Sequence, residues 1–348
     1  MSRNMIQIQA DIFEKLRASI EQAGEHGRAI DIDKPRWIKG NALDVDALKK
    51  ASLVASARVS THGVITVCRY ANCAFVVLPG EIAGRTGIPD LLEQTEQNAG
   101  LLALALSDPQ VIPAVEALAI VDAVFGHAGE FEIGELLPLF SNPVLFQFAT
   151  QHEQRKPPEL LSLAQAACAH QILEKYPSGW FSTSKTLFQD ICRGEVARFA
   201  GDALLSATMA RESHHAFLQL YRAFEGLFRI MLVQSFAAKV RQKLDEHMMT
   251  ISHALVDELT WRMRDDVAFQ KLVGLIDEVE AKRIADRLGV APDKIVKTVY
   301  ETRNRIAHGS ILYRPPSLTA AFIEGCLLLL QQAFVVVRVA ESWIPETI

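Results

Sequence analysis

The sequence lacks the features that mark several common classes of protein. Its five cysteines are odd in number and scattered, and no two of them form a CxxC pair. This excludes a disulfide framework and a cysteine-based zinc site. An excess of charge of one sign is also missing, because 36 basic residues stand against 41 acidic ones. The chain therefore has no overall electrostatic footprint for coating nucleic acid, and any nucleic acid would have to meet a local patch.

Long apolar segments are scarce as well. The first residues contain no hydrophobic region of the kind found in a secretory signal. The longest apolar runs, such as Cys326 to Leu330, are much shorter than the roughly 18 residues that a membrane-spanning helix needs. We therefore expect a cytoplasmic protein with no membrane partner.

Several widespread motifs are absent too. The chain has no GxGxxG, Walker A, GxSxG, HExxH or EF-hand pattern, which removes the usual nucleotide, hydrolase and metalloprotease motifs. Two pairs of histidines remain, His214 with His215 and His247 with His253. Neither spacing brings two rings to one face of a helix, so neither pair chelates a metal well. We expect no metal site and no cofactor.

What the sequence does contain is typical of a globular protein of about two domains, given 348 residues and roughly 150 residues per domain. Residues 52–78 alternate with period two and are broken at 61–63 and 71–72, which predicts a three-stranded antiparallel meander. Helical spacing of apolar residues predicts helices over 11–25, 89–106 and 114–125. We therefore interpret residues 1–150 as an α+β region of sensing or regulatory type with a small antiparallel sheet.

The remainder of the sequence is typical of helices alone. The prolines at 157 and 158 begin a new helix over 159–176, and residues 151–195 are interpreted as a helical linker. The fold class is thus mainly α, with a C-terminal helical bundle over 196–348. The helices predicted in that bundle span 196–244 (with a break allowed), 247–261, 267–288, 293–308 and 317–343.

The most informative segment is DKIVKTVYETRNRIAHG, from Asp293 to Gly309. Asp293 is a good helix-start residue and Gly309 is typical of the position just after a helix, so the segment predicts one helix of about four turns. Arg303 lies beside its apolar stripe, where a plain surface helix has no need of a guanidinium. Asn304 and His308 are four residues apart and share a face. A cation, an amide and an imidazole are therefore expected to converge near the end of this helix.

Those three groups suit cleavage of RNA in which the 2′-hydroxyl attacks the adjacent phosphate. Arg303 can stabilise the charge that develops on the phosphoryl oxygens, and Asn304 can orient the ribose or the imidazole. His308 can transfer protons because histidine titrates near neutral pH. The negative end of the helix dipole favours the protonated ring and hence an acid role.

At this point the sequence resembles a known family. YETRNRIAHG resembles the signature helix of the HEPN superfamily, an Arg followed after four to six residues by a His, often with Asn directly after the Arg. A second segment, FLQLYRAFEGLF over 217–228, resembles the helix that carries an acidic side chain in many relatives, which would be Glu225. The resemblance covers about residues 196–343 and does not extend to 1–150.

The resemblance implies a helical bundle that dimerises, with two signature helices forming one composite site for metal-independent endoribonuclease activity. Many members are toxins or abortive-infection effectors against phage. The expected partners are thus RNA, a second copy that docks through residues 293–309, and an antitoxin or a phage-derived activator. Some relatives are silenced by nucleotidylation of a Tyr two residues after the His. Here that position is Ser310, so the resemblance does not extend to this control.

The expected site has a catalytic and an RNA-binding part. The locally basic surroundings of Arg303 can hold a few phosphates. The catalytic set is Arg303, His308, Asn304 and Glu225, and the RNA-binding set is Lys297, Arg305 and Tyr300.

The alternative to a nuclease is a non-catalytic HEPN module that binds nucleotide, RNA or a protein partner.

Simpler explanations stand beside each of these assignments. The segment from Arg241 to His247 has the same Arg-to-His spacing, although it lacks the Asn, the apolar spacing and the final Gly. Glu225 has Arg222 and Arg229 at helical distances and can form ordinary surface ion pairs with them. His308 can be a simple helix cap, and Tyr300 can serve packing alone.

Overall fold

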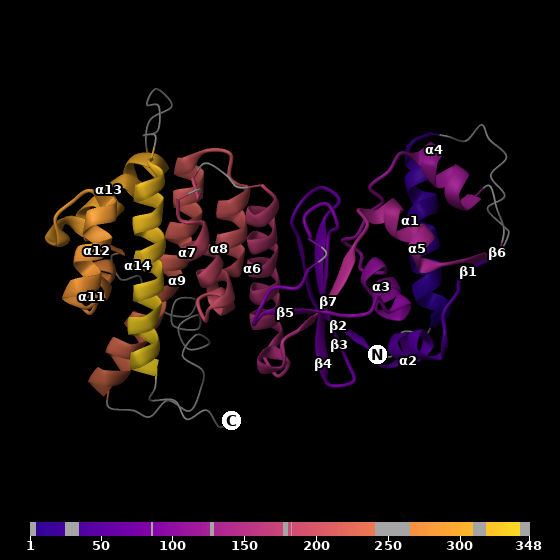
Figure 1. Ribbon diagram of the computed structural model, residues 1–348, viewed down its shortest axis with the longest axis horizontal. Coiled ribbons are helices and arrows are strands. Elements are labelled where there is room, and N and C mark those ends of the chain that lie inside the picture. Colours follow the sequence, from indigo (N-terminus) through magenta and orange to yellow (C-terminus); the bar gives the residue numbers. More distant parts are fainter. Residues whose placement is uncertain are drawn as a thin grey trace. The chain divides into compact units, whose positions relative to one another are not determined.

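The structure of the chain is a computed structural model that describes residues 5–24, 35–84, 86–125, 129–176, 180–181, 183–240, 265–308 and 318–341 (Figure 1). Within these residues the chain is mainly helical and has a five-stranded antiparallel sheet in its N-terminal half. It divides into two compact units, Met1–Lys175 and Tyr176–Ile348. We call them the sheet unit and the helical unit.

The predicted meander is confirmed in the sheet unit. It consists of β2 (Ser52–Arg58), β3 (Val64–Tyr70) and β4 (Cys73–Leu78), each antiparallel to the next. Ala71 and Asn72 connect β3 to β4 with φ values of 51° and 67°. Two consecutive left-handed residues give the backbone twist that a two-residue hairpin needs. The turn therefore holds the register that the alternating apolar pattern predicts.

Two strands from distant parts of the chain complete this sheet. β5 (Leu92–Gln94) and β7 (Val144–Phe148) add to its edge in the order β2-β3-β4-β7-β5. The prediction of one helix over 89–106 was wrong in its first half, since only α3 (Ala99–Leu106) is helical there. The side chain of Asn98 accepts a hydrogen bond from Leu101 N and starts that helix. The three-residue β5 depends on pairing with β7, which no local pattern indicates.

Helices cover both faces of the sheet (Figure 1). α6 (Pro157–Lys175) packs on β2 and β3. The opposite face, which includes Cys68 and Phe75, joins a core with α1 (Met5–Gln22) and α3. Burial on both faces explains why β3 and β4 contain nearly continuous apolar runs.

α2 (Ala42–Lys50) and α3 approach each other closely at Asp44. The Asp44 carboxylate accepts hydrogen bonds from Asn41 N and from Ala99 N, both at 2.9 Å. Gly100 lies against the same residue, because a Cβ placed there would be 2.1 Å from the Asp44 carbonyl oxygen. One carboxylate thus caps two helix ends, and a glycine allows the helices to meet.

The sheet unit also contains short elements that the sequence did not indicate. β1 (Arg36–Ile38) pairs in parallel with β6 (Gly129–Phe131). The helix expected over 114–125 is shorter, because α4 (Ala117–Ile120) continues as a π-helical turn, η1 (Val121–Phe125). Arg36 Nε donates to the Val124 carbonyl oxygen at 3.2 Å near the end of that turn. The remaining elements are α5 (Ile133–Leu136), η2 (Leu137–Phe140) and η3 (Thr150–His152).

The described part of the helical unit contains helices only. α9 and α14 pack side by side, α8 packs on α9, and α12 packs on α14 (Figure 1). Gly325 allows α14 to approach α12, since a Cβ there would be 2.7 Å from Leu288 Cδ2. The helices are α7 (Lys185–Arg193), α8 (Ala197–Met209), α9 (Ser213–Val240), α11 (Asp265–Val273), α12 (Glu278–Leu288), η4 (Pro292–Lys294), α13 (Ile295–His308) and α14 (Ala320–Glu341).

The helices of this region agree with the prediction only in part. The segment 196–244 is broken between Met209 and Ser213, as the prediction allowed. The segment 267–288 is two helices and not one, because the chain turns at Gly274 and α12 restarts at Asp277, whose side chain accepts from Val279 N. The helix expected over 247–261 lies outside the described residues. The expected linker 151–195 is divided between the units, with α6 in the sheet unit and α7 in the helical unit.

One described helix is long and apolar enough to span a membrane by length and composition alone. It is the stretch Ala320–Val337 of α14, with a mean hydropathy of 1.9. The uninterrupted apolar runs in it are short, as the sequence indicated, and the stretch reaches this mean although it contains Glu324 and the two glutamines at 331 and 332. More than half of this stretch, 56%, is buried inside the protein. A buried core helix passes the same test, so the feature is weak evidence for a membrane span.

Candidate functional site

α13 places the signature residues on its flank and last turn. Proline in the first turn of η4 precedes the helix. Ile295, Val299 and Thr302 form its buried face. Arg303 lies next to that face and keeps 24% of its side chain exposed. Gly309, the expected end of the helix, lies outside the described residues.

Arg303 is the centre of the candidate site. Its Nη1 donates to Asn304 Oδ1 at 3.1 Å and lies 3.2 Å from His308 Nε2. Its Nη2 donates to Glu225 Oε1 at 3.4 Å. The other three residues that the sequence suggested as catalytic therefore lie around the Arg303 guanidinium. Glu225 comes from α9, 78 residues earlier in the chain.

His308 lies with one ring nitrogen against Arg303. A guanidinium N–H can only donate, so the contact at 3.2 Å is a hydrogen bond when Nε2 carries the lone pair. With a lone pair on Nε2 the ring can accept a proton, and with a proton there it can donate one, so the place of His308 beside Arg303 fits either role.

The described ion pair of Glu225 is the one with Arg303, on another helix. Arg222, one candidate for an ordinary surface ion pair, donates instead to Gln219 Oε1 at 2.9 Å. The side chain of Arg229, the other candidate, lies outside the described residues. The carboxylate is 37% exposed, so water weakens its attraction to Arg303 but leaves its directing effect.

An aromatic cluster lies beneath Arg303. The Arg303 Cζ atom is 5.7 Å from the centre of the Tyr221 ring, within the range of a cation–π contact. Tyr221 is only 1% exposed. The Tyr221 ring contacts those of Phe224, Phe228 and Phe269, with centroids 6.1 to 6.3 Å away. Tyr221 lies one turn before Glu225 on α9, whereas Phe269 comes from α11.

The three expected RNA-binding residues lie differently on α13. Tyr300 is half-buried, and by helix geometry it lies about 60° from Arg303, on the side of Asn304 and His308. Lys297 is exposed on the same side, and its Nζ lies 3.8 Å from Glu301 Oε1. Arg305 is exposed but lies about 160° from Arg303. Tyr300 and Lys297 are therefore next to the site, and Arg305 is not.

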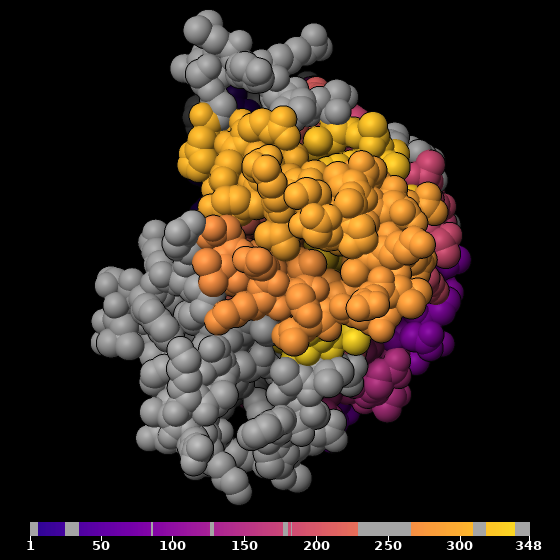
Figure 2. All heavy atoms as spheres, turned by 90° about the vertical axis from the view of Figure 1, so that its left-hand side faces the viewer, coloured from indigo at the N-terminus to yellow at the C-terminus, as the bar shows by residue number. Residues whose placement is uncertain are grey.

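Figure 2 shows the face of the molecule on which α11, α12 and α13 form a continuous surface. Lys297 and His308 are among the exposed residues of α13. α13 contacts α11 and α9 on its inner side. The candidate site thus lies where the surface helix α13 packs on α9.

Other groups that could carry chemistry are less organised. In the described parts of the chain, no three His, Cys, Asp or Glu side chains gather at metal-binding distance. His214 and His215 lie with ring centres 4.2 Å apart, and burial lowers the pKa of His214. His247, His253 and the segment from Arg241 to His247 lie outside the described residues.

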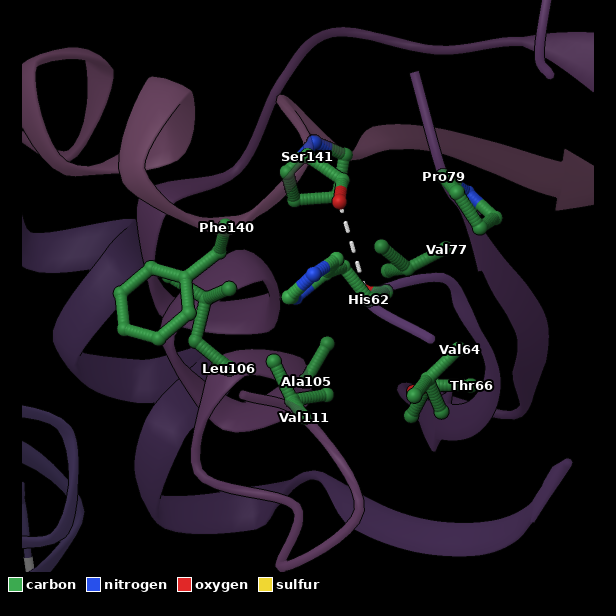
Figure 3. Close-up of a pocket in the computed structure, with 11 residues that line it drawn as sticks. His62, Val64, Thr66, Val77, Pro79, Ala105, Leu106, Val111, Phe140 and Ser141 are labelled. Atoms are coloured by element: carbon green, nitrogen blue, oxygen red, sulfur yellow. Dashed lines mark hydrogen bonds between the residues drawn. The ribbon is translucent and has the colours of Figure 1, made fainter. Parts of the chain in front are cut away.

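Two cavities lie outside the candidate site at Arg303. The first, of about 10 Å³, lies in the sheet unit, where His62 faces Leu106 and Phe140 (Figure 3). It has room for about one water molecule, and most of its lining is apolar. The second, of about 190 Å³, lies in the helical unit and is lined by apolar residues together with Asp202 and Arg222. Neither brings together an acid, a base and a charge-stabilising group.

Comparisons of the chain with protein-family models, with curated proteins and with solved structures found no match.

Proposed function

We propose that this protein is a metal-independent endoribonuclease of HEPN type, with its site at Arg303, Asn304, His308 and Glu225. The observation that carries the proposal is the shared guanidinium, whose two terminal nitrogens contact an amide, an imidazole and a carboxylate. The resemblance of the signature helix to the HEPN superfamily supports the same conclusion. Lys297 and Tyr300 would hold the neighbouring RNA, with Arg305 further round the helix.

The proposed reaction needs no group beyond those of the protein and the RNA. His308 Nε2 takes the proton of the ribose 2′-hydroxyl, and the oxygen attacks the adjacent phosphorus. The bond from phosphorus to the 5′-oxygen breaks, and that oxygen receives a proton from an acid. Arg303 Nη1 exchanges its contact with His308 for one with the phosphoryl oxygens and stabilises their charge. The products are a 2′,3′-cyclic phosphate and a 5′-hydroxyl.

The proton transfers of the reaction support a two-copy arrangement. One copy supplies one His308, whereas the reaction uses a base and an acid. A symmetric homodimer with residues 293–309 of both copies face to face doubles every group, and two-fold dimers are the commonest oligomers.

The biological setting is part of the proposal and comes from the resemblance. The protein would act in the cytoplasm as a toxin or an anti-phage effector. The sheet unit would then sense or regulate, and an antitoxin or a phage-derived activator would control the nuclease. Binding of RNA or nucleotide without cleavage would instead indicate a non-catalytic HEPN module.

The deciding experiment incubates the purified full chain with total RNA in EDTA. We expect cleavage to persist in EDTA and to leave 5′-hydroxyl ends, because Arg303 and His308 supply the charge and the proton transfer. His308→Ala should lower the rate at least roughly a hundredfold. His247→Ala is the matched control and should leave the rate unchanged. Products with 5′-phosphates, or loss of activity on chelation, would contradict the mechanism.

The homodimer has its own test. Light scattering should show a dimer at concentrations where RNA is cleaved, and the specific activity should fall on dilution as the dimer dissociates. A monodisperse monomer whose specific activity is independent of concentration would refute the composite site.

A further inference from the structure

The aromatic cluster under Arg303 is more than ordinary core packing. Tyr221, Phe224, Phe228 and Phe269, here called the aromatic floor, come from α9 and α11, and α13 packs on both helices. Among the described cation–π contacts, Tyr221 is the member of this floor that lies under the Arg303 guanidinium, at 5.7 Å. The other three rings pack around Tyr221, and the ring of Phe217, with its centroid 6.0 Å away, packs against it as well.

Two contacts therefore restrain the guanidinium in different directions. The Tyr221 ring packs against the Arg303 guanidinium, and Glu225 Oε1 accepts a hydrogen bond from Nη2 at 3.4 Å. With both restraints, Nη1 is left facing Asn304 and His308. An ion pair of two flexible, partly exposed side chains is a weak restraint by itself. A ring packed among three phenylalanines cannot turn away, so it sets the position of the guanidinium more firmly.

We propose that Tyr221 is the positioning residue of the Arg303 site, and that its ring holds the guanidinium so that Nη1 is presented to the substrate phosphate. This inference rests on the proposed ribonuclease function. Tyr221 is 1% exposed, so it acts through Arg303 and not by touching RNA. Loss of a positioning contact makes the reactive geometry rarer and leaves most of the binding surface intact. The effect should therefore fall on kcat more than on KM.

The test compares Tyr221→Met with Phe228→Met. Both remove one ring from the aromatic floor, and methionine fills irregular space, so their losses of stability should be similar. Only Tyr221→Met removes the ring under Arg303. We expect Tyr221→Met to lower kcat about tenfold with KM within about threefold of wild type. Phe228→Met should keep kcat within about threefold. Tyr221→Phe, which retains the ring, should restore kcat.

A second readout does not depend on RNA cleavage. NMR of the arginine side chains, assigned with Arg303→Lys, reports whether the Arg303 guanidinium is held. We expect its N–H signals to be sharp and protected in the wild type and in Phe228→Met, and to be lost in Tyr221→Met. If the wild type cleaves no RNA, the proposed function fails, while this readout still decides whether Tyr221 positions Arg303.

Two results would overturn the inference. One is an equal fall of kcat in Tyr221→Met and Phe228→Met, which would show that only stability matters. The other is an Arg303 signal that stays protected in Tyr221→Met. Should Tyr221→Met not fold, Tyr221→Leu and Phe228→Leu repeat the comparison with the same expected outcomes.

Discussion

Several cationic side chains of the sheet unit bind main-chain carbonyl oxygens, whereas Arg303 of the helical unit binds side chains. In the sheet unit, Lys15 donates to the carbonyl oxygens of Leu106 and Asp108, and Arg69 donates to those of Glu153 and Arg155. Arg58, Arg36 and Lys175 likewise bind main-chain carbonyls. In the helical unit, each hydrogen bond described for Arg303 goes to a side chain.

This difference separates a structural cation from a candidate functional one. A cation that binds main-chain carbonyls satisfies the acceptors left at loops and helix ends, and its removal leaves those acceptors without a partner. Arg303 satisfies no described main-chain group, so the fold has less need of it. Its partners are an amide, an imidazole and a carboxylate, which are the groups that orient and exchange protons in active sites. The hydrogen-bond partners thus distinguish Arg303 from a structural arginine such as Arg69, which the sequence alone does not.

The largest expected effect comes from replacing one arginine in each unit. Arg303→Ala should lower the rate of RNA cleavage at least roughly a hundredfold, because it removes the group that stabilises the developing charge. Its free energy of unfolding should change by about 1 kcal/mol or less, since the ion pair with Glu225 is partly exposed. Cleavage kinetics and denaturant unfolding measure the two quantities.

Arg69→Ala is the matched control in the sheet unit. It should lower the free energy of unfolding by about 1–3 kcal/mol, because the carbonyls of Glu153 and Arg155 lose their donor. The cleavage rate of the folded protein should stay the same. The distinction between the units fails if Arg303→Ala mainly destabilises or if Arg69→Ala mainly inactivates.

The next comparison concerns the two close helix contacts. Gly100→Ala should destabilise the protein by about 1–3 kcal/mol, because the added Cβ meets the carbonyl oxygen of Asp44, which cannot move freely. Gly325→Ala should change stability by about 1 kcal/mol or less. Its nearest neighbour is Leu288 Cδ2, the end of a side chain that can shift, and alanine favours the helix. Thermal unfolding of both variants tests the order, and a larger loss for Gly325→Ala would reverse it.

The smallest expected effect belongs to Glu225. Glu225→Gln keeps the size and an acceptor oxygen but removes the charge, so Arg303 should be less restrained without being lost. We expect the rate to fall about threefold to tenfold, which is roughly 0.7–1.4 kcal/mol in the barrier. Arg222→Ala, one turn away, should leave the rate unchanged, since it binds Gln219. Equal effects of the two substitutions would mean that Glu225 has only a surface role.

Local patterns predicted the longer helices and the meander, but not the pairing of strands that are distant in the chain. The meander β2 to β4 follows from short apolar segments separated by turn residues, and the helical part follows from helical spacing, because both signals lie within a few residues of one another. β5 and β7 were missed because three to five residues form a strand only when a partner stabilises them. The π-helical turn and the division at 274–277 likewise depend on packing and caps that the apolar spacing does not reveal.

The candidate site divides in the same way. The spacing of Arg303, Asn304 and His308 on α13 predicted their proximity, since three residues within two turns of a helix have nearly fixed relative positions. The spacing alone could not show that His308 Nε2 lies 3.2 Å from Arg303 Nη1, because this distance depends on the rotamers of both side chains. The acid role that the helix dipole suggested for His308 stays a prediction.

The sequence by itself thus determined that this protein has a helix ending in an Arg, an Asn and a His, because helix formation, caps and the apolar stripe are local properties. Only the tertiary structure decided what surrounds Arg303. Glu225 lies 78 residues earlier in the chain, and Phe269 comes from another helix. Their approach depends on how α9, α11 and α13 pack, which is set by the summed burial of many side chains and not by any spacing along the chain.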